Sequence, residues 1–218
     1  MSNPLVSVVV PVRAGEGVDL TMGSLMQQTL QDFEAHIIVD KDGQGAPWAR
    51  NQGAACARGE YLLFSDADVQ WVPDALECMV NTLAARLALE AALSKLGQPP
   101  RWRTAYAYGG KVILGAPGGD IGPLANAPWN YDELQQHNMV DTGALMLREA
   151  FTRWDEDLRR LQDWDLFLGM ARYNGLRGQW VGKVLHTTPY RAHGISFNGS
   201  GLSYQEATAI VKRKHNLL

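Results

Sequence analysis

Pairs of aspartates separated by one residue occur four times in the chain, at Asp40/Asp42, Asp66/Asp68, Asp155/Asp157 and Asp163/Asp165. In an extended backbone, residues i and i+2 point to the same side, so such a pair can present two carboxylates to one ligand. Carboxylate oxygens suit Mg²⁺ or Mn²⁺, which leave positions open for substrate phosphates. The spacing alone is weak evidence, because about one such pair is expected by chance at this aspartate content. Position in the fold must therefore decide.

Asp66 and Asp68 have the most informative position, directly after the apolar run Tyr61–Phe64. Charges at the end of a buried strand are costly unless a cation meets them. The pair is therefore predicted to hold a divalent cation. The alternative is that it caps and solvates the turn before a helix that begins near Pro73.

The first half of the chain alternates strand and helix patterns. The predicted elements are strands at 5–12, 36–39 and 61–64, and helices at 18–30, 49–57 and 75–96. Alternation of this kind predicts an α/β fold with a mostly parallel sheet and helices on both faces. In such a sheet, ligands bind at the carboxyl ends of the strands, where the acidic pairs and Arg50-Asn51 would gather.

The second half of the chain lacks this regular alternation and contains a long Gly/Pro-rich segment. It predicts strands at 104–114, 141–147 and 179–185, helices at 164–173 and 203–217, and a Gly/Pro-rich surface loop at 115–128. The chain has 218 residues, of which 46% are hydrophobic and 20% charged, as expected for one globular domain covering 1–218.

Charge and hydropathy exclude some partners. A net charge of -3 offers no basic footprint, so we expect no nucleic-acid partner. No apolar run reaches the roughly 20 residues of a membrane span and the start lacks a signal-peptide pattern, so a cytoplasmic location is expected. The basic end of the last predicted helix, residues 212–215, could make weak contact with an anionic membrane surface, or could complement the helix dipole.

The run from Val6 to Leu76 resembles glycosyltransferase family 2 and its GT-A fold. It combines VSVVVPV, IIVDKDG and ARNQGAACARGEYLLFSDADV with a following Pro-led helix. The resemblance implies that Asp40 or Asp42 contacts the uracil or ribose of a nucleotide-sugar, that Asp66 lies near the ribose, and that Asp68 binds Mn²⁺ or Mg²⁺. One departure is Val12-Arg13, where the family usually has an aromatic pair.

The same resemblance implies a division of labour. Residues 1–96 would be the nucleotide-binding half and residues 101–218 the acceptor-binding half. The expected donor-binding residues are Pro11, Arg13, Asp40, Asp42, Arg50, Asn51, Asp66 and Arg191.

The stretch LQDWDLFLGMARYNG resembles the acidic helix start of the family, with Gln162 in place of the usual Glu and Asp163 in the place of the catalytic base. A positioned carboxylate can accept the proton of an attacking hydroxyl. The alternative is that Asp163 only caps the helix. Asp165 is expected to be structural.

The segment YRAHGIS resembles the Tyr-Arg-x-His-x-x-Ser segment of the family. It places Arg191 on the diphosphate and His193 on the metal. A surface role for His193 is the alternative, and His186 is the second candidate for the ligand.

Together these residues predict a metal-dependent, inverting transfer of a sugar from a nucleotide-sugar, UDP-sugar being the commonest donor in similar families, to a glycan or other hydroxyl acceptor. Two alternatives are a nucleotidyltransferase and a catalytically inactive nucleotide-sugar-binding module of the same fold. Nothing in the sequence fixes the sugar or the acceptor.

Overall fold

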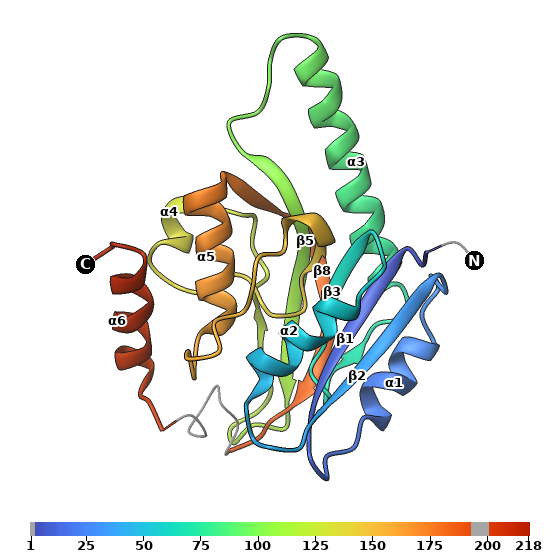
Figure 1. Ribbon diagram of the computed structural model, residues 1–218, viewed down its shortest axis with the longest axis vertical. Coiled ribbons are helices and arrows are strands. Elements are labelled where there is room, and N and C mark those ends of the chain that lie inside the picture. The colour runs from blue at the N-terminus through green and yellow to red at the C-terminus, as the bar shows by residue number, and fades with distance from the viewer. Residues whose placement is uncertain (1–2, 193–200) are drawn as a thin grey trace.

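The computed structural model describes residues 3–192 and 201–218, and its centre is one mixed sheet of eight strands (Figure 1). The strand order is β2-β1-β3-β7-β5-β8-β4, with β6 paired to β5. The strands are β1 (Val6–Arg13), β2 (Phe33–Asp40), β3 (Tyr61–Phe64), β4 (Gln70–Trp71), β5 (Arg103–Leu114), β6 (Ile121–Leu124), β7 (Leu145–Leu147) and β8 (Leu176–Pro189). Strands from both halves of the chain therefore share one sheet.

The helices pack on both faces of this sheet. They are α1 (Asp19–Met26), α2 (Ala46–Cys56), α3 (Ala75–Lys95), α4 (Tyr131–Leu134), α5 (Gln162–Asn174) and α6 (Tyr204–Lys214), with a 3₁₀ turn at Arg148–Ala150. Figure 1 shows the upper part of α3 projecting beyond the body and α6 lying beside α5.

Alternation along the buried strands divides the core into two layers. In β1, Val8 and Val10 join the cluster that contains Leu25 of α1 and Leu76 of α3, whereas Val9 joins the cluster that contains Phe167 of α5. Successive side chains of a strand point to opposite faces, so a continuous valine run supplies both layers. This confirms the predicted central strand with helices on both sides.

The sheet is mostly parallel in its long pairings. β1 pairs in parallel with β2 and β3, and β5 pairs in parallel with β8 over its length. The short strands β4, β6 and β7 pair antiparallel. The predicted fold class is therefore confirmed, with short antiparallel additions.

Two predicted elements differ in the structure, and one short strand was not predicted. The strand expected at 141–147 is only β7, because Oδ1 of Asp141 accepts the N–H of Gly143 at 3.2 Å and forms a turn there. The loop expected at 115–128 contains β6, and β4 was not predicted because two residues carry no periodic pattern.

Close approach of α2 to the sheet requires glycine at one point. A Cβ on Gly53 would lie 2.2 Å from Cγ1 of Val9, which is far inside van der Waals contact. Gly53 thus lets α2 lie directly on β1, with the start of the helix beside the carboxyl end of that strand.

The last helix is anchored by charge as well as by packing. Nε2 of His215 lies 2.8 Å from Oδ1 of Asp165, and Nζ of Lys214 lies 2.8 Å from Oδ2 of the same carboxylate. Asp165 therefore has the structural role that the sequence predicted. Two members of the basic cluster proposed for membrane contact, the buried His215 and the exposed Lys214, are therefore paired with Asp165.

Within residues 3–192 and 201–218, none of the helices is both long and apolar enough to cross a bilayer.

Candidate active site

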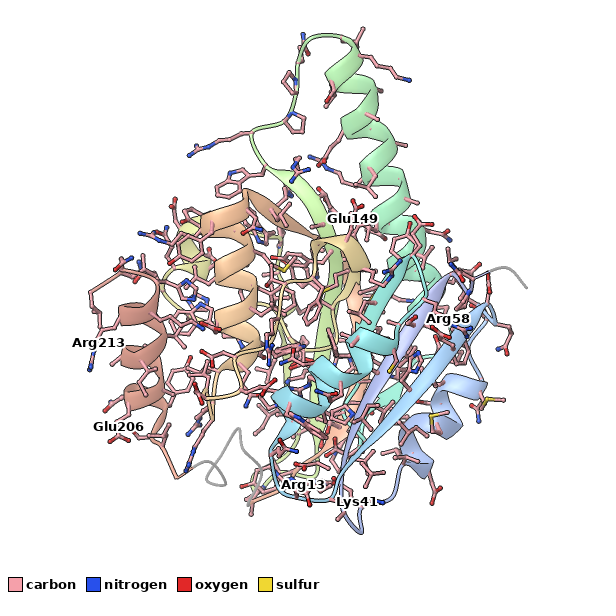
Figure 2. All side chains as sticks on the ribbon, viewed as in Figure 1. Arg13, Lys41, Arg58, Glu149, Glu206 and Arg213 are labelled. Carbon is pink, nitrogen blue, oxygen red and sulfur yellow. The ribbon has the colours of Figure 1, made fainter. Side chains whose placement is uncertain are left out.

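A cavity of about 560 Å³ opens at the edge of the sheet where β1 and β2 end. Figure 2 labels Arg13 and Lys41 at this edge, and Arg13 lines the cavity. Of the residues that the sequence predicted for donor and metal binding, seven line it: Pro11, Arg13, Asp40, Arg50, Asp66, Asp68 and Arg191. The structure thus brings together residues from the ends of three strands (β1, β2 and β3), from α2 and from the segment after β8.

Arg50 holds the first acid of the pair. Its Nη2 donates to Oδ1 of Asp66 at 2.6 Å, and its Nη1 donates to Oε1 of Gln162 at 3.0 Å. Arg50 is 4% exposed, and its Cζ lies over the ring of Trp154, 4.8 Å from the ring centroid. Arg50 therefore ties the acidic loop after β3 to the start of α5, one residue before Asp163.

Arg191 holds the second acid. Its Nε lies 2.8 Å from Oδ2 of Asp68, and its Nη1 donates to Oε1 of Glu16. Burial first, and then the charge of Asp66, raise the pKa of Asp68, while Arg191 acts in the opposite direction. Asp68 is thus a carboxylate that gains from a neighbouring cation, as a metal ligand would.

Asp40 has a role that the sequence did not predict. Its carboxylate accepts the backbone N–H of Gln44 at 2.9 Å and that of Gly45 at 2.7 Å. Burial would raise the pKa of Asp40, but these backbone donors lower it overall. The carboxylate therefore shapes the turn that leads into α2, while the residue still lines the cavity.

Two predicted donor-binding residues lie elsewhere. Asp42 is exposed on the turn before α2. Asn51 faces the loop before α5: its Nδ2 donates to the carbonyl oxygen of Trp154 at 3.0 Å and to Oε1 of Glu156 at 2.7 Å. Neighbouring helical residues point about 100° apart, and here Arg50 lines the cavity while Asn51 points to this loop.

Asp163 lies in the first turn of α5, after an unusual residue. Leu161 has a left-handed backbone conformation, with φ of 60°, which is uncommon for a side chain of this kind. Burial first, and then the charge of Asp141, raise the pKa of Asp163, while Lys111 opposes them. Oδ1 of Asp163 accepts the N–H of the following residue, Trp164, at 3.0 Å. The carboxylate is half-buried and predisposed to bind a proton.

One charged residue of the cavity, Lys111, was not predicted from the sequence. Lys111 lines the cavity, donates to Oδ2 of Asp141, and lies within electrostatic reach of both Asp66 and Asp163. The sequence did contain a feature that could have identified Lys111, because a lysine inside an otherwise apolar strand requires an anionic partner.

The two histidines considered as metal ligands have different outcomes. His193 lies outside the described residues. His186 is 2% exposed, and its Nε2 lies 3.2 Å from Oδ1 of Asp141. Its ring packs against that of Trp71, with centroids 4.6 Å apart and the ring planes tilted by 49°, so His186 belongs to a buried network beside the cavity.

Among the described residues, few side chains are available to a divalent cation. In the described ranges, no three His, Cys, Asp or Glu side chains are grouped to hold a metal ion. Asp66 and Asp68 offer two carboxylates beside the cavity. Two carboxylates fit a cation that takes its remaining ligands from substrate phosphates and water.

The fold and the cavity together define an α/β protein with a cavity at the carboxyl ends of parallel strands, the usual place for ligands in such sheets. The sequence model described as glycosyl transferase family 2 matches residues 22–154, which is more than half of the chain. The chain belongs to glycosyl transferase family 2.

Similar proteins agree with this assignment. The putative teichuronic acid biosynthesis glycosyltransferase TuaG of Bacillus subtilis (strain 168) is 22% identical over 158 residues, which cover 71% of this chain and 56% of that protein. The chain thus spans about half the length of the curated relative it matches.

Solved structures share the fold. S. aureus TarS 1-349 in complex with UDP-GlcNAc matches with a TM-score of 0.62 and 15% identity over 96% of this chain and 65% of that one. The mannosyltransferase PcManGT from Pyrobaculum calidifontis, in complex with GDP-Man and Mn²⁺, matches with a TM-score of 0.50 and 15% identity over 87% of this chain and 57% of that one.

Proposed function

We propose that this chain transfers a sugar from a UDP-sugar to a hydroxyl group of a glycan or other acceptor, with the help of Mn²⁺ or Mg²⁺ and with inversion at the anomeric carbon. The observation that carries the proposal is the cavity that gathers Asp66, Asp68 and Arg191. Arg50 links Asp66 to Gln162, which precedes Asp163. A site for an anionic nucleotide thus adjoins a candidate general base. Family membership displaces the nucleotidyltransferase alternative.

Asp163 is the proposed base. Its raised pKa indicates a carboxylate that gains from accepting a proton, which the acceptor hydroxyl must lose as it attacks. Inversion is the simpler outcome, because the site offers one base on the acceptor side and we assign no residue as a nucleophile beneath the sugar.

Arg191 is the proposed diphosphate-binding residue. Its planar guanidinium can form paired hydrogen bonds to phosphate oxygens once it leaves Asp68 and Glu16. Asp66 and Asp68 would hold the divalent cation, which supplies charge stabilisation to the departing diphosphate when bound.

Support for UDP comes from similar proteins. The TarS structures contain UDP and UDP-GlcNAc, whereas the mannosyltransferase contains GDP-Man. We therefore propose a UDP-sugar as the donor, with GDP-mannose as the comparison substrate.

Release of the nucleoside diphosphate is the direct test. The protein is incubated with UDP-GlcNAc, UDP-glucose, UDP-galactose and GDP-mannose, with and without a glycan acceptor, in Mn²⁺ or EDTA. We expect UDP release that requires both Mn²⁺ and acceptor. Tight UDP binding without turnover under any condition would instead favour the inactive binding module.

A further inference from the structure

Three residues on neighbouring strands form a row beside the cavity. Lys111 of β5 pairs with His186 of β8, and His186 pairs with Trp71 of β4. Residues paired across strands have side chains on the same face of the sheet. The row continues into the acidic loop, because Nε1 of Trp71 donates to Oγ of Ser65 at 2.9 Å. Ser65 directly precedes Asp66.

Asp141 connects two members of this row, Lys111 and His186. Its Oδ2 accepts from Nζ of Lys111, while its Oδ1 lies 3.2 Å from Nε2 of His186 and accepts the N–H of Gly143 at 3.2 Å. Burial would raise the pKa of Asp141, but Lys111 and then His186 lower it well below its usual range. Asp141 is thus an ionised carboxylate with three partners in fixed positions.

Packing leaves little room for this carboxylate to move. A Cβ on Gly143 would lie 2.8 Å from Cη2 of Trp71 and 3.1 Å from Cε1 of His186. The turn that carries Asp141 therefore lies directly against the row. This close fit holds the Lys111 ammonium at one place in the cavity wall.

The Lys111 ammonium retains capacity to bind a ligand. An ammonium has three N–H donors, and in the described part of the chain Asp141 accepts one of them. The side chain is 23% exposed and lines the cavity. The charges of Asp163 and Asp66 both raise the pKa of Lys111, so its ammonium is near both carboxylates. Under the proposed function, the group transferred from the nucleotide at Asp66 to the acceptor at Asp163 is the sugar.

We propose that Lys111 binds a hydroxyl oxygen of the transferred sugar, and that Asp141 is the positioning residue that holds Lys111 there. The inference rests on the proposed function and adds a residue that selects the sugar. The diphosphate is left to Arg191, which contacts Asp68 beside the same cavity. A buried ion pair adds little stability over an apolar pair, so the open side of this one indicates a ligand-binding role.

The test compares two ligands that differ only in the sugar part. Calorimetry measures Kd for UDP and for UDP-GlcNAc, both with Mn²⁺, on the wild type and Lys111→Met. We expect UDP-GlcNAc to bind about tenfold or more weakly to the variant, as for loss of a hydrogen bond to a charged group, while UDP stays within about twofold. Equal weakening of both ligands would overturn the inference and place Lys111 on the diphosphate.

A matched control is Lys183→Met, because Lys183 lies on the same strand as His186. This change breaks another lysine–aspartate ion pair, in which Nζ of Lys183 lies 2.5 Å from Oδ2 of Asp74. We expect both affinities to stay unchanged there. Lys111→Arg keeps the charge and should restore part of the UDP-GlcNAc affinity.

Asp141→Asn separates positioning from stability. The isosteric change should weaken UDP-GlcNAc selectively, by about threefold or more, because a neutral amide holds the ammonium less firmly. A lower unfolding temperature with an unchanged ratio of the two affinities would show a purely structural role and overturn the inference. Failure of the wild type to bind any of UDP, UDP-GlcNAc and UDP-glucose would remove the proposed function itself, and with it this inference.

Discussion

Nε of Arg191 lies 2.8 Å from Oδ2 of Asp68, so a guanidinium occupies the side of the carboxylate that the family resemblance assigns to a metal. The divalent metal ion and the guanidinium of Arg191 would compete for the same carboxylate oxygens of Asp68. Binding of the metal with its diphosphate should therefore release Arg191, which can then bind the phosphates. The ion pair neutralises the partly buried carboxylate of Asp68 before the ligand binds.

Asp68→Asn should abolish the effect of metal on nucleotide affinity. We expect the wild type to bind UDP at least about tenfold more tightly in Mn²⁺ than in EDTA, and the variant to bind equally in both. Calorimetry measures the four constants. The matched control is Asp157→Asn, because Asp157 is the exposed second acid of another pair with the same spacing. Equal wild-type affinity in EDTA and Mn²⁺ would contradict the metal assignment.

Arg191→Met should separate the metal from the diphosphate. Loss of the guanidinium frees Asp68, so Mn²⁺ alone should bind as tightly as in the wild type or more tightly. UDP in the presence of Mn²⁺ should bind about tenfold more weakly, since a charge-assisted hydrogen bond is lost. A parallel loss of both affinities would show that Arg191 supports the metal site and does not compete with it.

Asp163→Asn should lower kcat by about a hundredfold or more, the scale of a lost general base, with UDP affinity nearly unchanged. The pKa of Asp163 is raised, so its ionised form is disfavoured in the folded state and costs stability above that pKa. An uncharged amide removes this cost. The variant should therefore unfold at a temperature equal to or above that of the wild type at pH 7. If Asp163 served only as a helix cap, Asp163→Asn would instead be less stable than the wild type and would have normal turnover.

The fold was largely predictable because its signals are local. The valine run of β1, the apolar run of β3 and the helix patterns each identify an element by composition and period. Register and strand order were not predictable, since β7 inserts between β3 and β5 through only a few paired residues.

The candidate site was predictable where function follows a strand end, as at Asp66 and Asp68. It was not predictable where a residue's direction depends on packing. Asn51 follows Arg50 in sequence but faces another loop, and Asp141 stands in a turn that its own side chain creates. The pairing of Arg191 with Asp68 joins segments far apart in sequence, which no spacing pattern records.

Asn51→Ala should affect stability and leave the nucleotide site intact. Asn51 exchanges two hydrogen bonds with the backbone of Trp154, at 3.0 and 2.9 Å, so its loss leaves half-buried groups unpaired. We expect a loss of about 1–3 kcal/mol in the free energy of unfolding. UDP affinity should stay within about twofold. Gln52→Ala, at an exposed position of the same helix, is the control for chemical denaturation.

The pH dependence of turnover should report on the charges around Asp163. A general base works in its ionised form, so kcat falls as the pH drops through its pKa. Burial and Asp141 raise the pKa of Asp163, and Lys111 lowers it. Lys111→Met should therefore move the acid limb of the kcat profile to higher pH, and Asp141→Asn should move it to lower pH. The control Lys183→Met should leave it in place. General damage to the site would lower kcat at every pH without moving the acid limb. An acid limb at the wild-type pH in both Lys111→Met and Asp141→Asn would show that Asp163 is not the group that titrates.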